Sequence, residues 1–131
     1  MTSAPDTTEA RKWVLVVDDD PTVRTLFVDV LQEAGYRVVG AEDGYVAEDL
    51  IRDLFPDLIL LDLHMPRGSG FSLLNNMRKH PRWRAIPIVI VSGYLDRVKL
   101  LDETGLTVVG RIGKPVDADR LLALVRETLG D

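Results

Sequence analysis

The stretch Leu58-Ile59-Leu60-Leu61-Asp62 is an apolar run that ends in a carboxylate. A short run of this kind is typical of a strand that is covered on both faces. An ionised carboxylate is costly to bury at such a place unless it is paired or bound to a metal. Asp62 is therefore a candidate functional residue, although a solvated strand end or a helix cap would leave the same pattern.

Short apolar runs and helical stripes alternate on both sides of this stretch. Apolar residues that recur every three or four positions indicate helices, and short β-branched runs indicate strands. The predicted strands are Trp13–Val17, Arg37–Gly40, Leu58–Leu61, Ile86–Val91 and Thr107–Ile112. The predicted helices are Val23–Ala34, Val46–Leu54, Phe71–Met77, Leu95–Leu101 and Ala118–Leu129. This alternation predicts an α/β domain whose five-stranded parallel sheet has helices on both faces.

The composition excludes several classes of protein. The chain has 131 residues, no cysteine, two histidines and a formal net charge of −5. The length suits one domain, and the lack of cysteine excludes disulfides, zinc–thiolate sites and iron–sulfur clusters. The negative charge argues against direct binding of nucleic acid, and no apolar run approaches the roughly 18 residues of a membrane span. We expect a cytoplasmic domain at residues 12–131, preceded by a disordered N-terminal tail at residues 1–11.

Reactive side chains follow four of the five predicted strands. Ligands of open parallel sheets bind outside the carboxyl ends of the strands, near the point where the strand order reverses. These ends carry Asp18-Asp19-Asp20, Asp62, Ser92 and Lys114, whereas the second strand delivers no reactive residue. The order 2-1-3-4-5 would place the second strand at an edge and make the other four neighbours, so we predict that order.

The acidic run after the first strand divides into two parts. Asp20 precedes Pro21, and this pair predicts a helix N-cap followed by proline at the first helical position. Asp18 and Asp19 are adjacent carboxylates, each of which raises the other's pKa unless a cation lies between them. Mg²⁺ prefers oxygen ligands of this kind. A solvated acidic turn is the alternative interpretation of the pair.

The other strand ends supply groups that suit phosphoryl chemistry. Asp62 could share a metal with the acidic pair and attack phosphorus through its other oxygen. Lys114 would supply a positive charge and Ser92 a hydroxyl donor to phosphoryl oxygens. A lysine or a serine alone carries no information, and only the combination indicates this chemistry.

From Trp13 to Leu129 the chain resembles the receiver domain of bacterial two-component response regulators, of the chemotaxis-receiver type. Four motifs carry the resemblance. They are Val14-Leu15-Val16-Val17-Asp18-Asp19-Asp20, Asp57-Leu58-Ile59-Leu60-Leu61-Asp62-Leu63-His64-Met65-Pro66 with Gly70, Ile88-Val89-Ile90-Val91-Ser92-Gly93, and Lys114-Pro115. The resemblance implies a flavodoxin-like (βα)5 three-layer sandwich with the strand order 2-1-3-4-5.

The resemblance also implies a role for each matched residue. Asp62 matches the aspartate that accepts the phosphoryl group, and Asp18 and Asp19 match the acidic pair that binds Mg²⁺. Lys114 matches the lysine that pairs with the phosphoryl group. Ser92 matches the hydroxyl residue that turns toward this group when it arrives.

Further implications concern the neighbours of these residues. The backbone carbonyl of His64 is implied as a further metal ligand, and the Lys114–Pro115 peptide bond as cis. Receivers usually carry Tyr or Phe three residues before the lysine, whereas this chain has Arg111 at that switch position. We expect Tyr94 and the imidazole of His64 to hinder the attack of water on the phosphoryl group.

The implied partner is a sensor histidine kinase or a phosphotransfer protein that donates the phosphoryl group. The implied output surface comprises the fourth helix, the fifth strand and the last helix, which would bind an effector domain or a second copy of the chain. Neither nucleic acid nor a membrane is expected as a direct partner. The domain would catalyse only its own phosphorylation and dephosphorylation, so it is not expected to be an enzyme that acts on a separate substrate.

Three alternatives belong to other classes. A pseudo-receiver would be an interaction module that works without phosphorylation, and Arg111 favours it. A flavodoxin-like electron carrier is disfavoured because three aspartates would repel the flavin phosphate. A phosphatase of the haloacid dehalogenase type would need an acid two residues after Asp62, where this chain has His64.

Two aromatic residues have ordinary structural interpretations. His80 precedes Pro81, so we expect it at a solvated helix end. Trp83 lies between Arg82 and Arg84, a pattern that would suit stacking on nucleic acid. We instead expect Trp83 in a surface loop.

Overall fold

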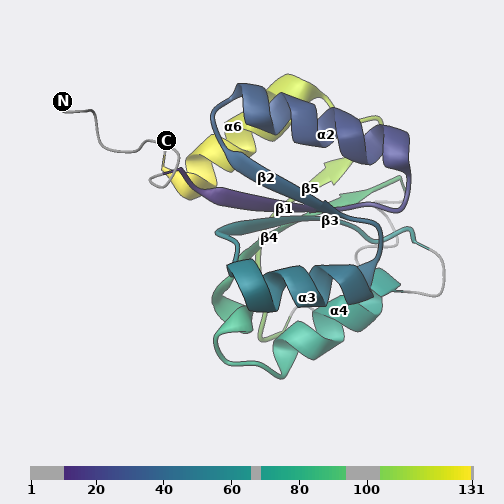
Figure 1. The fold of residues 1–131 in the computed structure, drawn as a ribbon, viewed down its shortest axis with the longest axis vertical. Helices are drawn as coiled ribbons and strands as arrows, with labels where there is room; N and C mark the ends of the chain where they lie inside the picture. Colours follow the sequence, from purple (N-terminus) through teal and green to yellow (C-terminus); the bar gives the residue numbers. More distant parts are fainter. Residues whose placement is uncertain (1–10, 66–68, 94–103, 131) are drawn as a thin grey trace.

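The computed structural model describes residues 11–65, 69–93 and 104–130, which form one parallel sheet between two layers of helices (Figure 1). The strands are β1 (Trp13–Val17), β2 (Arg37–Ala41), β3 (Leu58–Asp62), β4 (Pro87–Ser92) and β5 (Thr107–Gly113). The helices are α2 (Pro21–Glu33), α3 (Gly44–Leu54), α4 (Ser69–Arg78) and α6 (Ala118–Leu129), with a 3₁₀ turn η2 (Trp83–Ala85). The strand order is β2-β1-β3-β4-β5, which confirms the predicted sheet.

Some predicted features lie outside the described residues. They are the helix over Leu95–Leu101, Tyr94, Pro66 and all of the N-terminal tail except Arg11. Because the helix predicted at Leu95–Leu101 is among them, only β5 and α6 of the predicted output surface are described. No helix in the described ranges is long and apolar enough to cross a membrane.

The centre of the sheet is buried on both faces. All five residues of β3 are buried, because α2 and α6 cover one face and α3 and α4 cover the other (Figure 1). The side chains of β1 alternate between the two core layers: Leu15 and Val17 face the layer that includes α3 and α4, and Val14 and Val16 face the layer that includes α2 and α6. The uninterrupted apolar runs of the sequence follow from this two-sided burial.

The helices begin close to the carboxyl ends of the strands. Asp20 and Asp117 cap α2 and α6, because each side chain accepts hydrogen bonds from two backbone N–H groups of the first helical turn. The cap at Asp20 was predicted. After α2, Gly35 has a φ of +103°, a conformation that glycine adopts without strain. Short connections therefore place the acidic residues after β1 at one edge of the sheet.

The prediction that Trp83 lies in a surface loop is wrong. Its side chain is only 9% exposed and belongs to the core cluster that contains Ile51, Met77 and Ile86. The 3₁₀ turn η2 carries the indole inward against this layer. His80 is exposed, as predicted, and its ring stacks on Trp83 with 4.2 Å between centroids. The burial of the indole also removes the possibility that Trp83 stacks on nucleic acid.

Candidate functional site

Three carboxylates converge at the carboxyl edge of the sheet. Asp18 follows β1, Asp19 is the next residue, and Asp62 ends β3. Each offers an oxygen, and these oxygens all lie within 4.8 Å of one another. Asp18 and Asp62 are almost fully buried, at 1% and 2% exposure, whereas Asp19 is exposed. The predicted cluster is therefore formed, and it has one side open to solvent.

The backbone fixes Asp18 in place. Its N–H donates to the carbonyl of Ala41 at 3.1 Å, and its Oδ1 accepts from the N–H of Asp20 at 3.0 Å. Its carbonyl accepts from Nη1 of Arg24 at 2.8 Å. Sequence reasoning missed Arg24, because a basic residue in the first turns of α2 gives no signal that it reaches back to the strand end.

Asp62 is held by two donors on different elements. Its Oδ1 accepts from the backbone N–H of His64 at 2.9 Å, and its Oδ2 accepts from Nζ of Lys114 at 3.1 Å. The same Nζ lies 3.8 Å from Oδ2 of Asp18. Lys114 thus stands between the two buried carboxylates and partly balances their charge.

The connection after β5 sets the position of Lys114. Its N–H donates to the carbonyl of Ser92 at 3.0 Å, which ties the end of β5 to the end of β4. The Lys114–Pro115 peptide bond is cis, as the resemblance implied. The end of β5 therefore presents an ammonium group to Asp62, next to the strand end that carries Ser92.

The electrostatics of the cluster favour a cation. Burial raises the pKa of Asp18 above its ordinary value of 3.8, and the charges of Asp62 and Asp19 act in the same direction. The N–H of Asp20 and the ammonium of Lys114 oppose this rise. Within the described part of the chain, Oδ2 of Asp18 is buried without a hydrogen-bond partner.

The donor set fits a hard divalent cation. Three carboxylates converge, and one buried oxygen lacks a donor. Mg²⁺ is bound through carboxylate oxygens and keeps several waters, which the exposed side at Asp19 would admit. On this chemistry the acidic triad suits a bound metal ion.

Close backbone packing supports the floor of the site. A Cβ added at Gly70 would lie 3.0 Å from the carbonyl oxygen of Asp62 and 3.2 Å from Cα of Leu63. The first turn of α4 therefore lies directly against the end of β3. A larger residue at position 70 would press on the backbone that carries Asp62.

The remaining predicted site residues have distinct environments. Ser92 ends β4 and is 4% exposed, one position beyond the Asp62–Val91 register pair. The side chain of His64 is exposed, and so is Arg111 on β5. The roles predicted for these residues stay predictions.

Comparison with known proteins gives consistent matches. The sequence profile of the response regulator receiver domain matches residues 14–126. Over 119 residues the chain is 34% identical to the "DNA-binding dual master transcriptional regulator RpaA" of Synechocystis sp., a match that covers 88% of this chain and 48% of that protein. The chain thus spans about half the length of this relative.

Two further proteins match along nearly their whole length. The chain is 30% identical over 123 residues to the "Polar-differentiation response regulator DivK" of Brucella ovis, covering 92% of this chain and 98% of that protein. The crystal structure of the response regulator TrrA of Thermotoga maritima, in complex with Mg(2+)-BeF, superposes with a TM-score of 0.78 at 30% identity. That match covers 89% of this chain and 98% of TrrA.

Proposed function

Because the chain belongs to the response regulator receiver family, we propose that Asp62 accepts a phosphoryl group from a histidine kinase or a phosphotransfer protein. Membership of this family sets aside the electron carrier and the haloacid dehalogenase-type phosphatase. A receiver is a signalling switch and not an enzyme that turns over a separate substrate. The pseudo-receiver is the alternative that the experiment below must exclude.

One observation carries the proposal. Asp62 is buried, and its Oδ2 accepts a hydrogen bond from Nζ of Lys114 at 3.1 Å. Its carboxylate lies close to those of Asp18 and Asp19. A carboxylate on a purely structural strand end would need neither the acidic neighbours nor the lysine. The arrangement suits a transferred phosphoryl group, because such a group brings negative charge that positive neighbours stabilise.

The metal in this proposal is Mg²⁺. Asp18, Asp19, Asp62 and the backbone carbonyl of His64 are the groups that would hold it. The bound ion would neutralise negative charge on the phosphoryl oxygens. The Mg(2+)-BeF complex of TrrA supports this assignment, as does Oδ2 of Asp18, which is buried without a hydrogen-bond donor among the described residues.

The transfer step uses one oxygen of Asp62 as nucleophile. A new O–P bond forms to the phosphorus of the donor's phosphohistidine, the P–N bond breaks, and the imidazole leaves with the electron pair and takes up a proton. Lys114 stabilises the charge on the phosphoryl oxygens, and it already lies beside the acceptor. The hydroxyl of Ser92 then donates to a phosphoryl oxygen.

The output in this proposal is a shift in a surface. Movement of Ser92 toward the phosphoryl group would shift the conformational equilibrium of one face of the domain. This face is formed by the helix predicted at Leu95–Leu101, by β5 and by α6. An effector domain or a second copy of the chain would read that face. Arg111 lies on β5 at the position where receivers usually carry an aromatic ring. In this chain the shift of the surface would therefore proceed without an aromatic side chain at that position.

Intact mass tests the proposal. After incubation with acetyl phosphate and Mg²⁺, the wild type should gain the mass of one phosphoryl group, and Asp62→Asn should gain nothing. Asp53→Asn, which removes an exposed carboxylate from α3, is the matched control and should gain the group as the wild type does. A folded wild type that gains no mass would instead establish the pseudo-receiver.

A further inference from the structure

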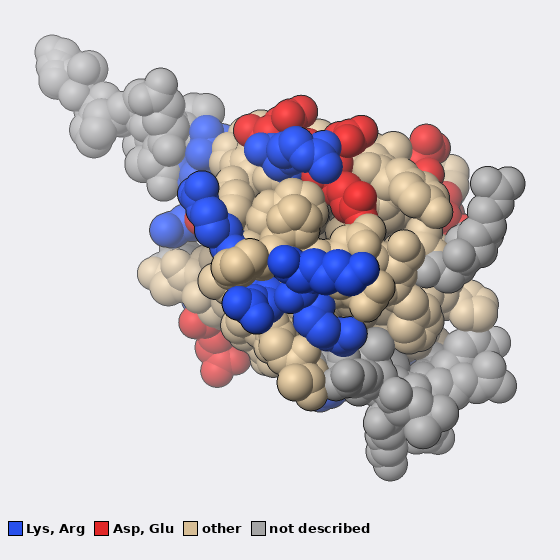
Figure 2. Space-filling view, turned by 90° about the horizontal axis from the view of Figure 1, so that it is seen from below, with Lys and Arg blue, Asp and Glu red and all other residues tan. Residues whose placement is uncertain are grey.

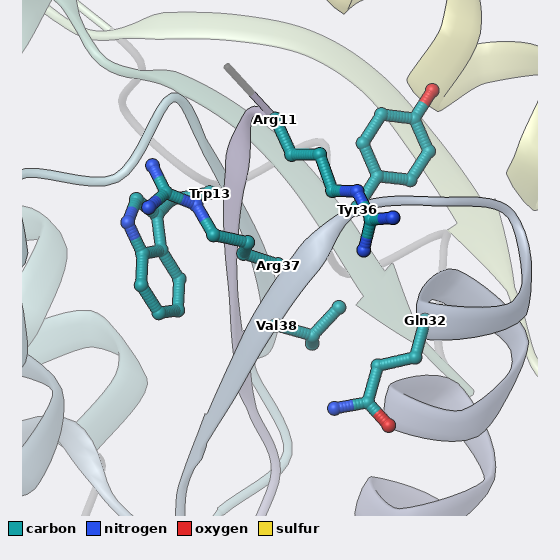
Figure 3. Close-up of a pocket in the computed structure, with 6 residues that line it drawn as sticks. All are labelled: Arg11, Trp13, Gln32, Tyr36, Arg37 and Val38. Carbon is teal, nitrogen blue, oxygen red and sulfur yellow. The ribbon is translucent and has the colours of Figure 1, made fainter. Parts of the chain in front are cut away.

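A pocket of about 490 Å³ lies where β1 and β2 begin, at the opposite end of the sheet from the carboxylates. Figure 3 shows the residues that line it. It surrounds the first residues of β1 and β2, and its lining comprises Arg11, Trp13, Gln32, Tyr36, Arg37 and Val38. This volume falls in the range of sites that bind ligands. The receiver function does not use this part of the molecule.

The pocket is positively charged in a protein whose net charge is negative. Arg11 and Arg37 line it, and no Asp or Glu is among the lining residues. Neither guanidinium makes a hydrogen bond or an ion pair with the part of the chain that the structure describes, and Nε of Arg37 is buried without an acceptor. The guanidinium of Arg37 instead packs on the ring of Trp13, 4.5 Å from the centroid. A buried donor of this kind favours a ligand with an acceptor.

The pocket lies along an open edge of the sheet. β2 is the outermost strand, and the N–H of Arg37 points inward to the carbonyl of Lys12 at 3.0 Å. Because backbone groups alternate in direction along a strand, the N–H and C=O of Val38 and Gly40 point away from β1. These groups could pair with an added strand.

The side chains around this edge lie on both faces of the sheet. Figure 3 shows Arg37 and Trp13 on one side of β2, and Arg11, Tyr36 and Gln32 on the other. An extended segment paired with β2 would direct alternate side chains to these two sides. Acidic side chains of the segment would therefore meet a guanidinium on either face.

We propose that this pocket and the edge of β2 bind an extended polypeptide segment that carries Asp or Glu side chains. The backbone of the segment pairs with Val38 and Gly40, and its carboxylates form charge-assisted hydrogen bonds with Arg37 and Arg11. The planar guanidinium group suits a carboxylate in two-point contact. Charge complementarity thus favours an acidic partner, and the open edge of β2 favours a partner in an extended conformation.

The surrounding surface supports an acidic partner. The view of the face covered by α3 and α4 shows Lys and Arg side chains gathered over its middle (Figure 2). The seven residues from the end of α4 through the start of η2, in the connection to β4, include four basic ones: Arg78, Lys79, Arg82 and Arg84. This connection precedes β4, so it lies at the same end of the sheet as the pocket. Its charge would attract an acidic segment before contact.

The test uses the full chain labelled with ¹⁵N and a short capped peptide of alternating Glu and Thr, observed by NMR. The amide signals of Val38 and Gly40 and the indole signal of Trp13 should shift and saturate. Arg37→Gln and Arg11→Gln should each weaken binding by about tenfold, the effect of one lost charge-assisted contact. Arg120→Gln removes an exposed charge from α6 and should bind as the wild type does.

Four results would overturn the proposal. They are the absence of shifts at Val38 and Gly40, equal binding of a peptide with Gln in place of Glu, equal saturation by sodium acetate alone, and tighter binding of oligothymidylate at the same signals. The first denies the added strand, and the second denies the role of charge. Saturation by acetate alone would mean that the pocket binds small anions without a polypeptide. Tighter binding of oligothymidylate would mean that the ligand is a nucleic acid.

Discussion

The ammonium of Lys114 lies 3.1 Å from Oδ2 of Asp62, although 52 residues separate them in the chain. The contact joins the loop after β5 to the end of β3, which are not adjacent strands. Since β4 lies between them, the long lysine side chain must cross the end of β4 to reach the carboxylate. This contact therefore links the outer strand to the acidic cluster.

Replacing Lys114 by Gln should slow phosphorylation of Asp62. The variant loses a positive charge next to the acceptor, and we expect a rate at least about tenfold lower with acetyl phosphate, from the loss of one charge-assisted contact. The rate is measured by intact mass against time. Arg120→Gln should keep the wild-type rate, and an equal loss in both variants would mean that overall charge, and not this contact, is responsible.

Replacing Asp18 by Asn should stabilise the metal-free protein. The pKa of Asp18 is raised mainly by burial, so its ionised form is less favourable in the folded state than in the unfolded state. At neutral pH the neutral amide removes this penalty, and the melting temperature in EDTA should rise. The same variant should lose most of the rise in melting temperature that Mg²⁺ gives the wild type. A lower melting temperature in EDTA would contradict the prediction.

The pH dependence of the metal-free protein follows from the same pKa. Because the folded-state pKa of Asp18 is above 3.8, its favourable contribution is present at low pH and is lost as the pH rises through the raised value. Other carboxylates also titrate there, so the informative quantity is the difference in melting temperature between Asp18→Asn and wild type. This difference should grow with pH in EDTA and should then level off. A difference that does not change with pH would disprove the assignment.

Much of the fold was predictable because its signals are local. The five predicted strands agree with the structure to within one residue at each end, since buried strands leave continuous apolar runs. The caps at Asp20 and Asp117 were predictable from side-chain chemistry alone. The convergence of Asp18 and Asp62 followed from the strand order, which brings the carboxyl ends of β1 and β3 together.

Other features depend on tertiary packing and leave little trace in the sequence. Trp83 is flanked by arginines, so local polarity indicated a surface position, yet the turn η2 directs its indole into the core. Arg24 lies on α2 and reaches the carbonyl of Asp18, a contact at a separation of six residues that no helical periodicity predicts. In both cases the partner is chosen by the three-dimensional arrangement of neighbouring elements.

Replacing Trp83 by Ala should destabilise the domain strongly. Its side chain is 9% exposed and packs in the layer with α3 and α4. Removing a buried aromatic ring costs about 3–5 kcal/mol, which urea denaturation should reveal as a lower midpoint. Phe71→Ala is the control, because Phe71 is 51% exposed and should lose far less. Similar losses in both variants would show that Trp83 is not a core residue.

Replacing Gly44 by Ala should also lower the free energy of unfolding. Here the cause is a clash with backbone atoms and not a cavity. A Cβ at Gly44 would collide with the carbonyl oxygen of Ser69, so the first turns of α3 and α4 would have to separate. Overpacking of this kind typically costs about 1–3 kcal/mol. Gly93→Ala is the control, because a Cβ there meets nothing within 4 Å and the φ of Gly93 is not positive. Urea midpoints compare the two variants, and an unchanged midpoint for Gly44→Ala would mean that α4 moves away from α3 without loss of core contacts.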